Sequence, residues 1–386
     1  MEIKRIKGVV KDYAWGNKDF IPSLIGDYNG KPQAELWLGT HPSGDARLED
    51  GTPLSRLMHD DRSYLGKDWD RFEGKLPLLM KILAIDKPLS LQCHPNKAQA
   101  VEGWAKEKEK REKGEPCSYS DDNPKCEMFL ALSPVTAMCG FRDPEVIKAD
   151  LAAVVPSAYG RTIKTISGSI KELFMSLFAL PSDEKKAILS ELSESLKGST
   201  NPSWDGLFLT RCGVARRCLE EHSDDIGCLF PYLLNIVHLR VGEALPIVPD
   251  TLHAYVFGNG VELMNASDNV LRGGLTPKRI DLAELERIMS FDEYDAVKCT
   301  ASEDGFGRTV YSSPSPDFRL LSASSGRYEI RNDSVAIAIV TEGSVRFSSK
   351  GDVMTVSKGE SVVIPASLEY SMNVNGEIFI SEVPDA

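Results

Sequence analysis

The feature that most restricts the fold of this chain is a weak internal repeat. Residues 242–253 and residues 359–369 both run from Gly-Glu through a short apolar stretch to a proline and a turn. With a one-residue gap, the matching positions are Gly242 and Gly359, Glu243 and Glu360, Pro249 and Pro365, and His253 and Glu369. A strand followed by a turn, used twice in this way, indicates two related β units in one chain.

The order of Gly-Glu, strand, proline, turn and histidine resembles the second motif of the cupin barrel. This resemblance implies a mainly β fold with two cupin-like (jelly-roll) β-barrels. Short strands separated by Gly, Asn and Asp turns across residues 300–386 are typical of such a barrel. The second copy has Glu369 where a ligand histidine would stand, so we expect it to be metal-free and structural.

Between residues 143 and 227 helical signals replace strand alternation. The clearest predicted helix begins at Ser182 as its N-cap and ends at Gly198, and residues 201–203 (Asn-Pro-Ser) are expected to separate two helical stretches. We therefore expect a helical domain inserted in the first barrel. The predicted domains are a discontinuous catalytic cupin domain at 1–142 and 228–299, the helical insert at 143–227, and a C-terminal metal-free cupin-like domain at 300–386.

Composition argues against several classes of protein. The chain has 386 residues and a formal net charge of -12, which indicates two or three domains and disfavours nucleic acid or an anionic membrane as partner. Its apolar runs are far shorter than the ~18 residues of a membrane helix, and residues 1–25 show no secretory signal. No two of the eight cysteines form Cys-x-x-Cys, so we expect reduced thiols. We expect a cytoplasmic monomer.

A strand is predicted over Leu89–His94, because apolar and polar residues alternate there and Pro95 closes the stretch. Alternation places Ser90, Gln92 and His94 on one face. Two metal-capable groups two residues apart on one strand can hold a cation rigidly, and we interpret Gln92 and His94 as half of a zinc site. The alternative is an ordinary amphipathic strand with one wet face.

Two more metal-capable side chains are Glu127, which leads into the predicted strand that begins at Phe129, and His253, which follows the turn of the first Gly-Glu repeat. With Gln92 and His94 they would offer one metal two imidazoles, a carboxylate and an amide oxygen, which suits one Zn²⁺ per chain and would also suit Mn²⁺, Fe²⁺ or Co²⁺. Lys125 shares a face with Glu127 if that strand begins by Lys125. The other histidines are expected at the surface (His41, His59 and His222) or as a satisfied core residue (His238).

Several cations could gather around a phosphate in this otherwise acidic chain. They are Arg272, which precedes two glycines that allow close backbone approach, and Lys278, Lys125 and Lys87. Taken singly, each could instead be a solvated surface cation. Trp15 could form a pocket wall or belong to the core.

These residues carry a resemblance to the type I mannose-6-phosphate isomerase family over essentially the full chain. The matching stretches are Tyr13–Asn17, Ala34–Gly44, Leu76–Pro95, Lys125–Arg142 and Asn235–Lys278, the most specific being Ser90–Pro95 and Ser267–Lys278. The resemblance implies Gln92, His94, Glu127 and His253 as zinc ligands and Arg272 as the active-site arginine. One departure is Pro124-Lys-Cys-Glu-Met128, where the family usually has His-Lys-Pro-Glu-Met. A histidine sometimes considered for proton transfer is therefore absent.

The resemblance implies reversible conversion of mannose 6-phosphate to fructose 6-phosphate through a cis-enediol, with zinc stabilising the developing charge. Glu262 is the first candidate for the base, since a carboxylate in a partly dry pocket can have a raised pKa, and Lys125 is the second. Substrate contacts are expected from Trp15, Ser90, Lys87, Lys278 and Asp268.

Two alternatives stay open. Two histidines and a carboxylate also serve iron oxygenases, so another metal-cupin enzyme, such as an Fe²⁺ dioxygenase or a different sugar-phosphate isomerase, is the second enzyme hypothesis. A sugar-phosphate-binding regulator without catalysis is the hypothesis from another class. The ligand set and Arg272 argue against the regulator.

Overall fold

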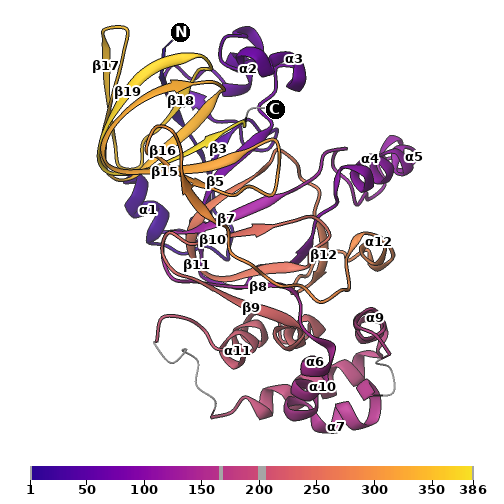
Figure 1. Cartoon of the computed structure of the whole chain (residues 1–386). Helices are drawn as coiled ribbons and strands as arrows, with labels where there is room; N and C mark the ends of the chain where they lie inside the picture. The colour runs from indigo at the N-terminus through magenta and orange to yellow at the C-terminus, as the bar shows by residue number, and fades with distance from the viewer. Residues whose placement is uncertain (1, 165–167, 199–205, 385–386) are drawn as a thin grey trace.

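The computed structural model describes residues 2–164, 168–198 and 206–384, and Figure 1 shows two β-sheets with helices gathered at one end and along one side. The described chain is mainly β, and all pairs between its named strands are antiparallel. This confirms the predicted fold class at that level. The predicted break at residues 201–203 lies outside the described residues.

A ten-stranded sheet has the order β10-β7-β11-β5-β3-β2, with β6, β8, β9 and β12 attached off this path. Its strands are β2 (Val9–Lys11), β3 (Glu35–Gly39), β5 (Leu78–Ile85), β6 (Leu91–Cys93), β7 (Glu127–Ala131), β8 (Val135–Phe141), β9 (Leu234–Leu239), β10 (Ala244–Ile247), β11 (His253–Asn265) and β12 (Leu271–Gly274). The strand predicted over Leu89–His94 is present but shorter than expected, since only Leu91–Cys93 (β6) form strand pairs with β11 and β12.

Strand β11 organises this sheet because it pairs with β6 and β8 along its first part and with β5 and β7 along its second part. A bulge between Tyr255 and Phe257 marks the change. A bulge adds one residue and so reverses which face the following side chains occupy. His253 and Glu262 are nine positions apart and would otherwise lie on opposite faces, yet both line one cavity.

A nine-stranded sheet has the order β13-β14-β15-β19-β16-β18-β1-β4, with β17 paired to β16. Its strands are β1 (Lys4–Lys7), β4 (Arg47–Leu48), β13 (Ala301–Glu303), β14 (Thr309–Tyr311), β15 (Arg319–Asn332), β16 (Ala336–Ser349), β17 (Asp352–Ser357), β18 (Ser361–Ile364) and β19 (Leu368–Glu382). The first strand of the chain therefore belongs to the same sheet as the last.

The expectation of almost all short strands after residue 300 was wrong for three of them, since β15, β16 and β19 each have 14 or 15 residues. These strands bend at bulges and continue, where the sequence suggested turns that would end them. At one bend Gly343 faces Gly376 across the β16–β19 pair, and both have positive φ. A Cβ at Gly343 would lie 1.8 Å from the Asn375 carbonyl oxygen, so only glycine fits there.

Helices cover the ends of the sheets. The helical segments are α1 (Phe20–Ile25), α2 (Leu54–Asp60), η1 (Gly66–Asp68), α3 (Trp69–Phe72), α4 (Lys97–Lys106), α5 (Lys108–Glu112), α6 (Pro144–Val154), α7 (Pro156–Ala158), η2 (Tyr159–Ile163), α9 (Ile170–Ala179), α10 (Ser182–Ser195), α11 (Arg211–Glu221), η3 (Ile226–Tyr232) and α12 (Leu282–Ile288). None of the described helices is long and apolar enough to cross a membrane.

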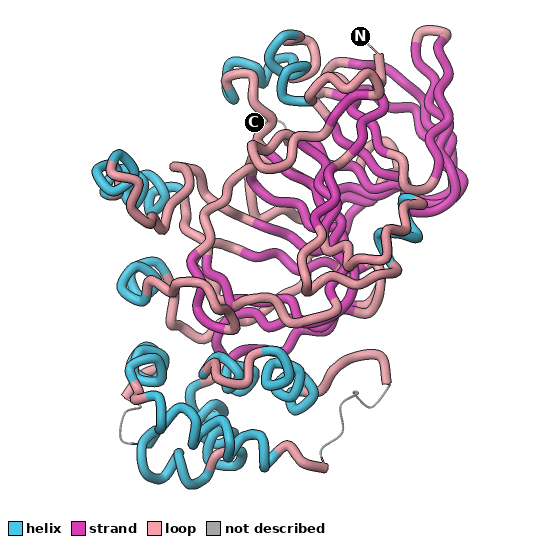
Figure 2. The backbone as a smooth tube through the Cα atoms, turned by 180° about the vertical axis from the view of Figure 1, so that it is seen from behind, coloured by secondary structure: helices cyan, strands magenta, loops and turns pink. Residues whose placement is uncertain are grey.

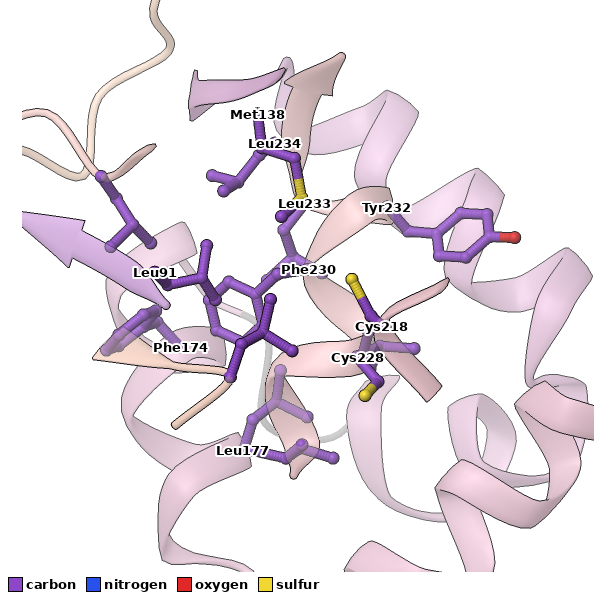
Figure 3. Packing of buried hydrophobic residues seen from close by; sticks show 14 of the residues in the cluster. Leu91, Met138, Phe174, Leu177, Cys218, Cys228, Phe230, Tyr232, Leu233 and Leu234 are labelled. Atoms are coloured by element: carbon purple, nitrogen blue, oxygen red, sulfur yellow. The ribbon is translucent and has the colours of Figure 1, made fainter. Parts of the chain in front are cut away.

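The segments from α6 to η3 all lie between β8 and β9 in the chain and form the helical layer seen in Figure 2. Their apolar faces share one buried cluster with strand residues such as Leu91 and Met138, as Figure 3 shows around Phe174 and Phe230. Helix α10 begins at Ser182, but Pro181 is its N-cap and the Ser182 side chain caps nothing. The helix ends at Ser195, three residues before the predicted Gly198, and Leu196 is its C-cap.

Candidate metal centre and active site

Three buried side chains from distant parts of the chain converge: His94, Glu127 and His253. One ligand atom from each lies within 4.8 Å of the others. His94 Nε2 is 3.2 Å from Glu127 Oε1, and His253 Nε2 is 3.3 Å from Glu127 Oε2. Buried imidazoles and a carboxylate facing one point are a donor set for a divalent cation.

The backbone fixes how both imidazoles point. His94 Nδ1 donates to the Asn269 carbonyl oxygen at 2.9 Å, and His253 Nδ1 donates to the Thr251 carbonyl oxygen at 3.0 Å. Since a carbonyl can only accept, each ring carries its proton on Nδ1 and turns an Nε2 lone pair toward Glu127. Burial, with Lys125 nearby, lowers the pKa of His94 to about 4, so its imidazole is neutral and able to ligate.

The amide of Gln92 lies beside this group. Strand β6 runs between β11 and β12, and Gln92 is directly opposite His253 on one side and Arg272 on the other. Directly opposed residues of antiparallel strands share a face. The Gln92 Nε2 donates to Ser90 Oγ at 3.3 Å, which leaves the amide oxygen as the atom that can reach a metal.

A cavity of about 60 Å³ opens beside the three converging side chains. Six of the residues predicted for the site line it, namely Ser90, Gln92, Lys125, Glu127, His253 and Glu262. His94 adjoins it through Glu127. These predicted side chains therefore do meet, although they come from three separate segments of the chain.

Lys125 is the buried cation of this group. Its Nζ contacts Glu127 Oε1 and lies 3.3 Å from His94 Nε2. Burial alone would raise the pKa of Glu127, but the positive charge of the adjacent Lys125 holds that pKa well below its usual range. Glu127 is therefore a carboxylate, as a metal ligand must be.

A second buried ion pair lines the cavity and was not predicted. Lys81 Nζ lies 2.9 Å from Glu262 Oε2, on directly opposed positions of β5 and β11. Burial raises the pKa of Glu262, and the nearby Lys81 opposes that rise. Burial would lower the pKa of Lys81, but the charges of Glu262, Glu35 and Glu127 reverse the effect and raise it.

Lys81, Glu35 and Tyr255 also line the cavity and were not among the predicted site residues. A signal for Lys81 exists in the sequence, because it is the one charged residue in the apolar run Leu78–Ile85. A lysine inside a buried strand requires a carboxylate partner. Glu35 lies in β3, next to β5, and accepts a hydrogen bond from Trp37 Nε1.

The other predicted substrate contacts lie outside the cavity wall. Arg272 is half-buried next to Gln92, and burial lowers the pKa of its guanidinium. Lys87 forms an ion pair with Glu221 at 2.8 Å, and Lys278 is exposed. Trp15 is half-buried and stacks on Tyr13, with ring centroids 6.0 Å apart.

His41 was expected at the surface, and that expectation was wrong: its side chain is only 5% exposed. Its Nε2 lies 3.1 Å from Asp268 Oδ2, and its ring contacts Trp37 edge-on. The turn-like Thr-His-Pro-Ser-Gly sequence suggested a solvated loop, but Asp268 comes from a distant segment that covers it. His238, by contrast, donates Nε2–H to the Leu209 carbonyl oxygen at 2.9 Å and takes no part in the metal-capable group, as expected.

Comparisons with known proteins identify the same family as the sequence motifs. Residues 3–144 match the family model of phosphomannose isomerase type I, catalytic domain. Mannose-6-phosphate isomerase of Escherichia coli K12 is 33% identical over 97% of both chains, and that of Rattus norvegicus is 31% identical over 94% of this chain and 95% of its own. The chain belongs to the mannose-6-phosphate isomerase family.

Solved structures of the family superpose closely. A mutant phosphomannose isomerase from Salmonella typhimurium matches with a TM-score of 0.89 and 30% identity over 99% of both chains. A mannose 6-phosphate isomerase bound with zinc and yttrium matches with a TM-score of 0.88 and 30% identity over 99% of both chains. Family membership and a metal-capable His-Glu-His group therefore rest on separate observations.

The departure from the usual family sequence, Pro124-Lys-Cys, is visible in the fold. Cys126 turns away from the cavity into the core between the sheets, and its backbone N–H donates to Asn265 Oδ1 at 3.1 Å. The usual family proline at this position would lack that donor. Burial raises the pKa of the Cys126 thiol to about 11, so it acts as a small apolar side chain.

Proposed function

We propose that this chain is a zinc-dependent aldose-ketose isomerase that interconverts mannose 6-phosphate and fructose 6-phosphate through a cis-enediol. The observation that carries the proposal is the convergence of His94, Glu127 and His253 beside a buried acid-base pair. Relatives that cover 97% and 94% of the chain bear the name mannose-6-phosphate isomerase. The proposed substrate is accordingly a small phosphorylated sugar.

Gln92, His94, Glu127 and His253 would hold one zinc ion per chain. The residues fit this ion, since both imidazoles present Nε2, Glu127 is ionised, and a relative of 30% identity binds zinc. When bound, zinc supplies Lewis-acid stabilisation of negative charge developing on the sugar oxygens.

Glu262 would move the proton between C2 and C1. A carboxylate with a raised pKa is a better general base near neutrality than an ordinary glutamate, and burial raises the pKa of Glu262. Lys81 opposes this rise through their 2.9 Å contact and so favours the ionised form of Glu262. Lys125 is the second candidate, because it lines the same cavity.

The remaining predicted residues would bind the substrate. Arg272 is proposed to assist ring opening or hold charge on the sugar, since it lies across the strands from Gln92. Ser90 lines the cavity and would contact the sugar. We propose Trp15 and Asp268 as further contacts, and Lys87 and Lys278 as cations for the phosphate.

The finer predictions about the fold are part of this proposal. The two sheets are proposed to form two cupin-like barrels, with residues 1–142 and 228–299 as the catalytic domain, 143–227 as a helical insert and 300–386 as a metal-free domain. Apolar side chains of the last sheet pack into one buried cluster, which supports a structural role for this domain. We propose a cytoplasmic monomer that binds no nucleic acid.

The test is an anaerobic assay of purified protein with mannose 6-phosphate. Turnover should disappear after treatment with a chelator and return when Zn²⁺ is added. Activity that requires O₂ would instead support an iron dioxygenase, and turnover of only a different sugar phosphate would support the other isomerase. Binding of mannose 6-phosphate without any turnover by metal-loaded protein would favour the regulator.

A further inference from the structure

We propose that His41 is a positioning residue for the metal centre, acting through Asp268 and the loop that orients His94. This inference rests on the proposed zinc site. It assigns a role to a buried histidine that neither ligates the metal nor lines the cavity.

The tautomer of His41 follows from its contacts. Its Nδ1 accepts a hydrogen bond from the Ser43 backbone N–H at 3.1 Å. The proton of the ring therefore resides on Nε2, which lies 3.1 Å from Asp268 Oδ2 and donates to it. The Trp37 ring lies edge-on at 5.0 Å, so the imidazole is held from two sides.

Asp268 belongs to the connection 266–270 between β11 and β12. This connection is bound to a second loop, because the Asp121 carboxylate accepts from Ser267 Oγ at 2.9 Å and from the Asp268 backbone N–H at 3.1 Å. Asn269 Nδ2 adds a bond to the Asp121 carbonyl oxygen at 2.9 Å. His41 contacts the Asp268 side chain and so links a third segment to this connection.

The backbone carbonyl of Asn269 is the group that accepts the His94 Nδ1 proton at 2.9 Å. Asn269 directly follows Asp268 in the chain. A displacement of this connection would turn the His94 ring and move Nε2 away from Glu127 and His253. Partners that orient a ligating histidine commonly change metal affinity by about 10–100-fold.

Packing and hydrogen bonding can be separated by the choice of variant. His41→Phe keeps an aromatic ring against Trp37 but removes the donor to Asp268. Asp268→Ala removes the same bond from the other end, at a side chain that is 49% exposed and so tolerates truncation. His59→Phe is the matched control, because His59 also pairs with an aspartate at 3.1 Å but on an exposed helix far along the chain from any proposed ligand.

The experiment measures the dissociation constant for Zn²⁺ by competition with a chromogenic chelator, and the visible spectrum of the Co²⁺-substituted protein, on the full chain. His41→Phe and Asp268→Ala should each weaken Zn²⁺ binding about 10–100-fold and alter the Co²⁺ spectrum, and the double variant should lose no more than the larger single loss. His59→Phe should match the wild type.

Wild-type affinity and an unchanged Co²⁺ spectrum in both single variants would overturn the role of His41 while leaving the zinc site intact. Additive losses in the double variant would also overturn it, since the two residues would then act separately. If His41→Phe fails to fold, the Asp268→Ala result decides alone. A wild-type chain that binds no Zn²⁺ would overturn the proposed metal site itself, and this inference with it.

Discussion

Lys81 and Glu262 face each other across neighbouring strands at 2.9 Å, with both side chains inside the protein. Breaking a buried pair by removing one partner costs several kcal/mol, because the other charge stays uncompensated. The pair also sets the protonation of the proposed base, since Lys81 opposes the rise in pKa that burial causes in Glu262. It therefore links the stability of the site to its chemistry.

Replacing Lys81 by methionine should shift the pH dependence of turnover. Without the positive charge the pKa of Glu262 rises further, so the carboxylate becomes protonated at a higher pH. The acidic limb of kcat/KM should move upward by about one unit or more, as one unit needs only ~1.4 kcal/mol of lost interaction. The pH–rate profile measures this, and activity should return in part as pH increases. A profile with an unmoved acidic limb would separate Glu262 from the proton transfer.

Glu262→Gln should abolish exchange of the C2 proton with solvent and lower kcat by roughly 10²–10⁴-fold, because an amide cannot act as a general base. The exchange is measured by NMR in ²H₂O. The control Glu329→Gln, at an exposed ion pair with Arg327, should exchange normally. Retained exchange in Glu262→Gln would transfer the role to Lys125 or to water.

His253→Ala should lose bound zinc together with activity, since it removes one imidazole of the buried group. Elemental analysis of the purified variant gives the metal content. The matched control is His238→Ala, because His238 is a partly buried histidine bonded to a carbonyl and not part of that group. Full metal content in His253→Ala would mean that the ligand is misassigned.

Arg272→Ala should keep its zinc and its melting temperature but lose most of its turnover, by roughly 10²–10³-fold if the guanidinium stabilises developing charge. Zinc analysis and circular dichroism accompany the kinetic assay. Folding should tolerate the change, since among the described residues no ion pair engages this side chain. Near-normal turnover would remove Arg272 from the proposed mechanism.

A buried ion pair in the C-terminal sheet should matter for stability alone. Arg308 Nη1 lies 2.6 Å from Glu382 Oε1, with side chains 3% and 2% exposed. Arg308→Met should lower the free energy of unfolding by about 3–5 kcal/mol, measured by urea denaturation. Arg327→Met breaks an exposed pair with Glu329 and should cost only ~0.2–1 kcal/mol. Equal effects of the two changes would contradict the assigned burial.

Much of the site could be predicted because its residues carry local signals. Gln92 and His94 alternate on a strand, Glu127 opens another, and His253 ends the Gly-Glu repeat unit. What could not be predicted depends on pairing between distant segments. The contact of Lys81 with Glu262 requires the register of β5 against β11, and a sequence does not give that register.

Two further features lay beyond sequence reasoning for the same reason. The bulge after Tyr255 brings His253 and Glu262 to one cavity, although simple alternation over nine positions would separate them. His41 is buried and pairs with Asp268, which lies far away in the sequence. The residues of a turn predict the turn itself, but they do not predict which distant segment packs against it.

Pairing of β1 with β18 has a consequence for how the protein is made. Lys4 pairs with Val363, and Ile6 with Ser361, so during synthesis β1 waits for a partner that is made much later. At about 5–20 residues per second that wait lasts tens of seconds. During this time the edge of β1 that will pair with β18 is open to other strands, although its opposite edge can already pair with β4.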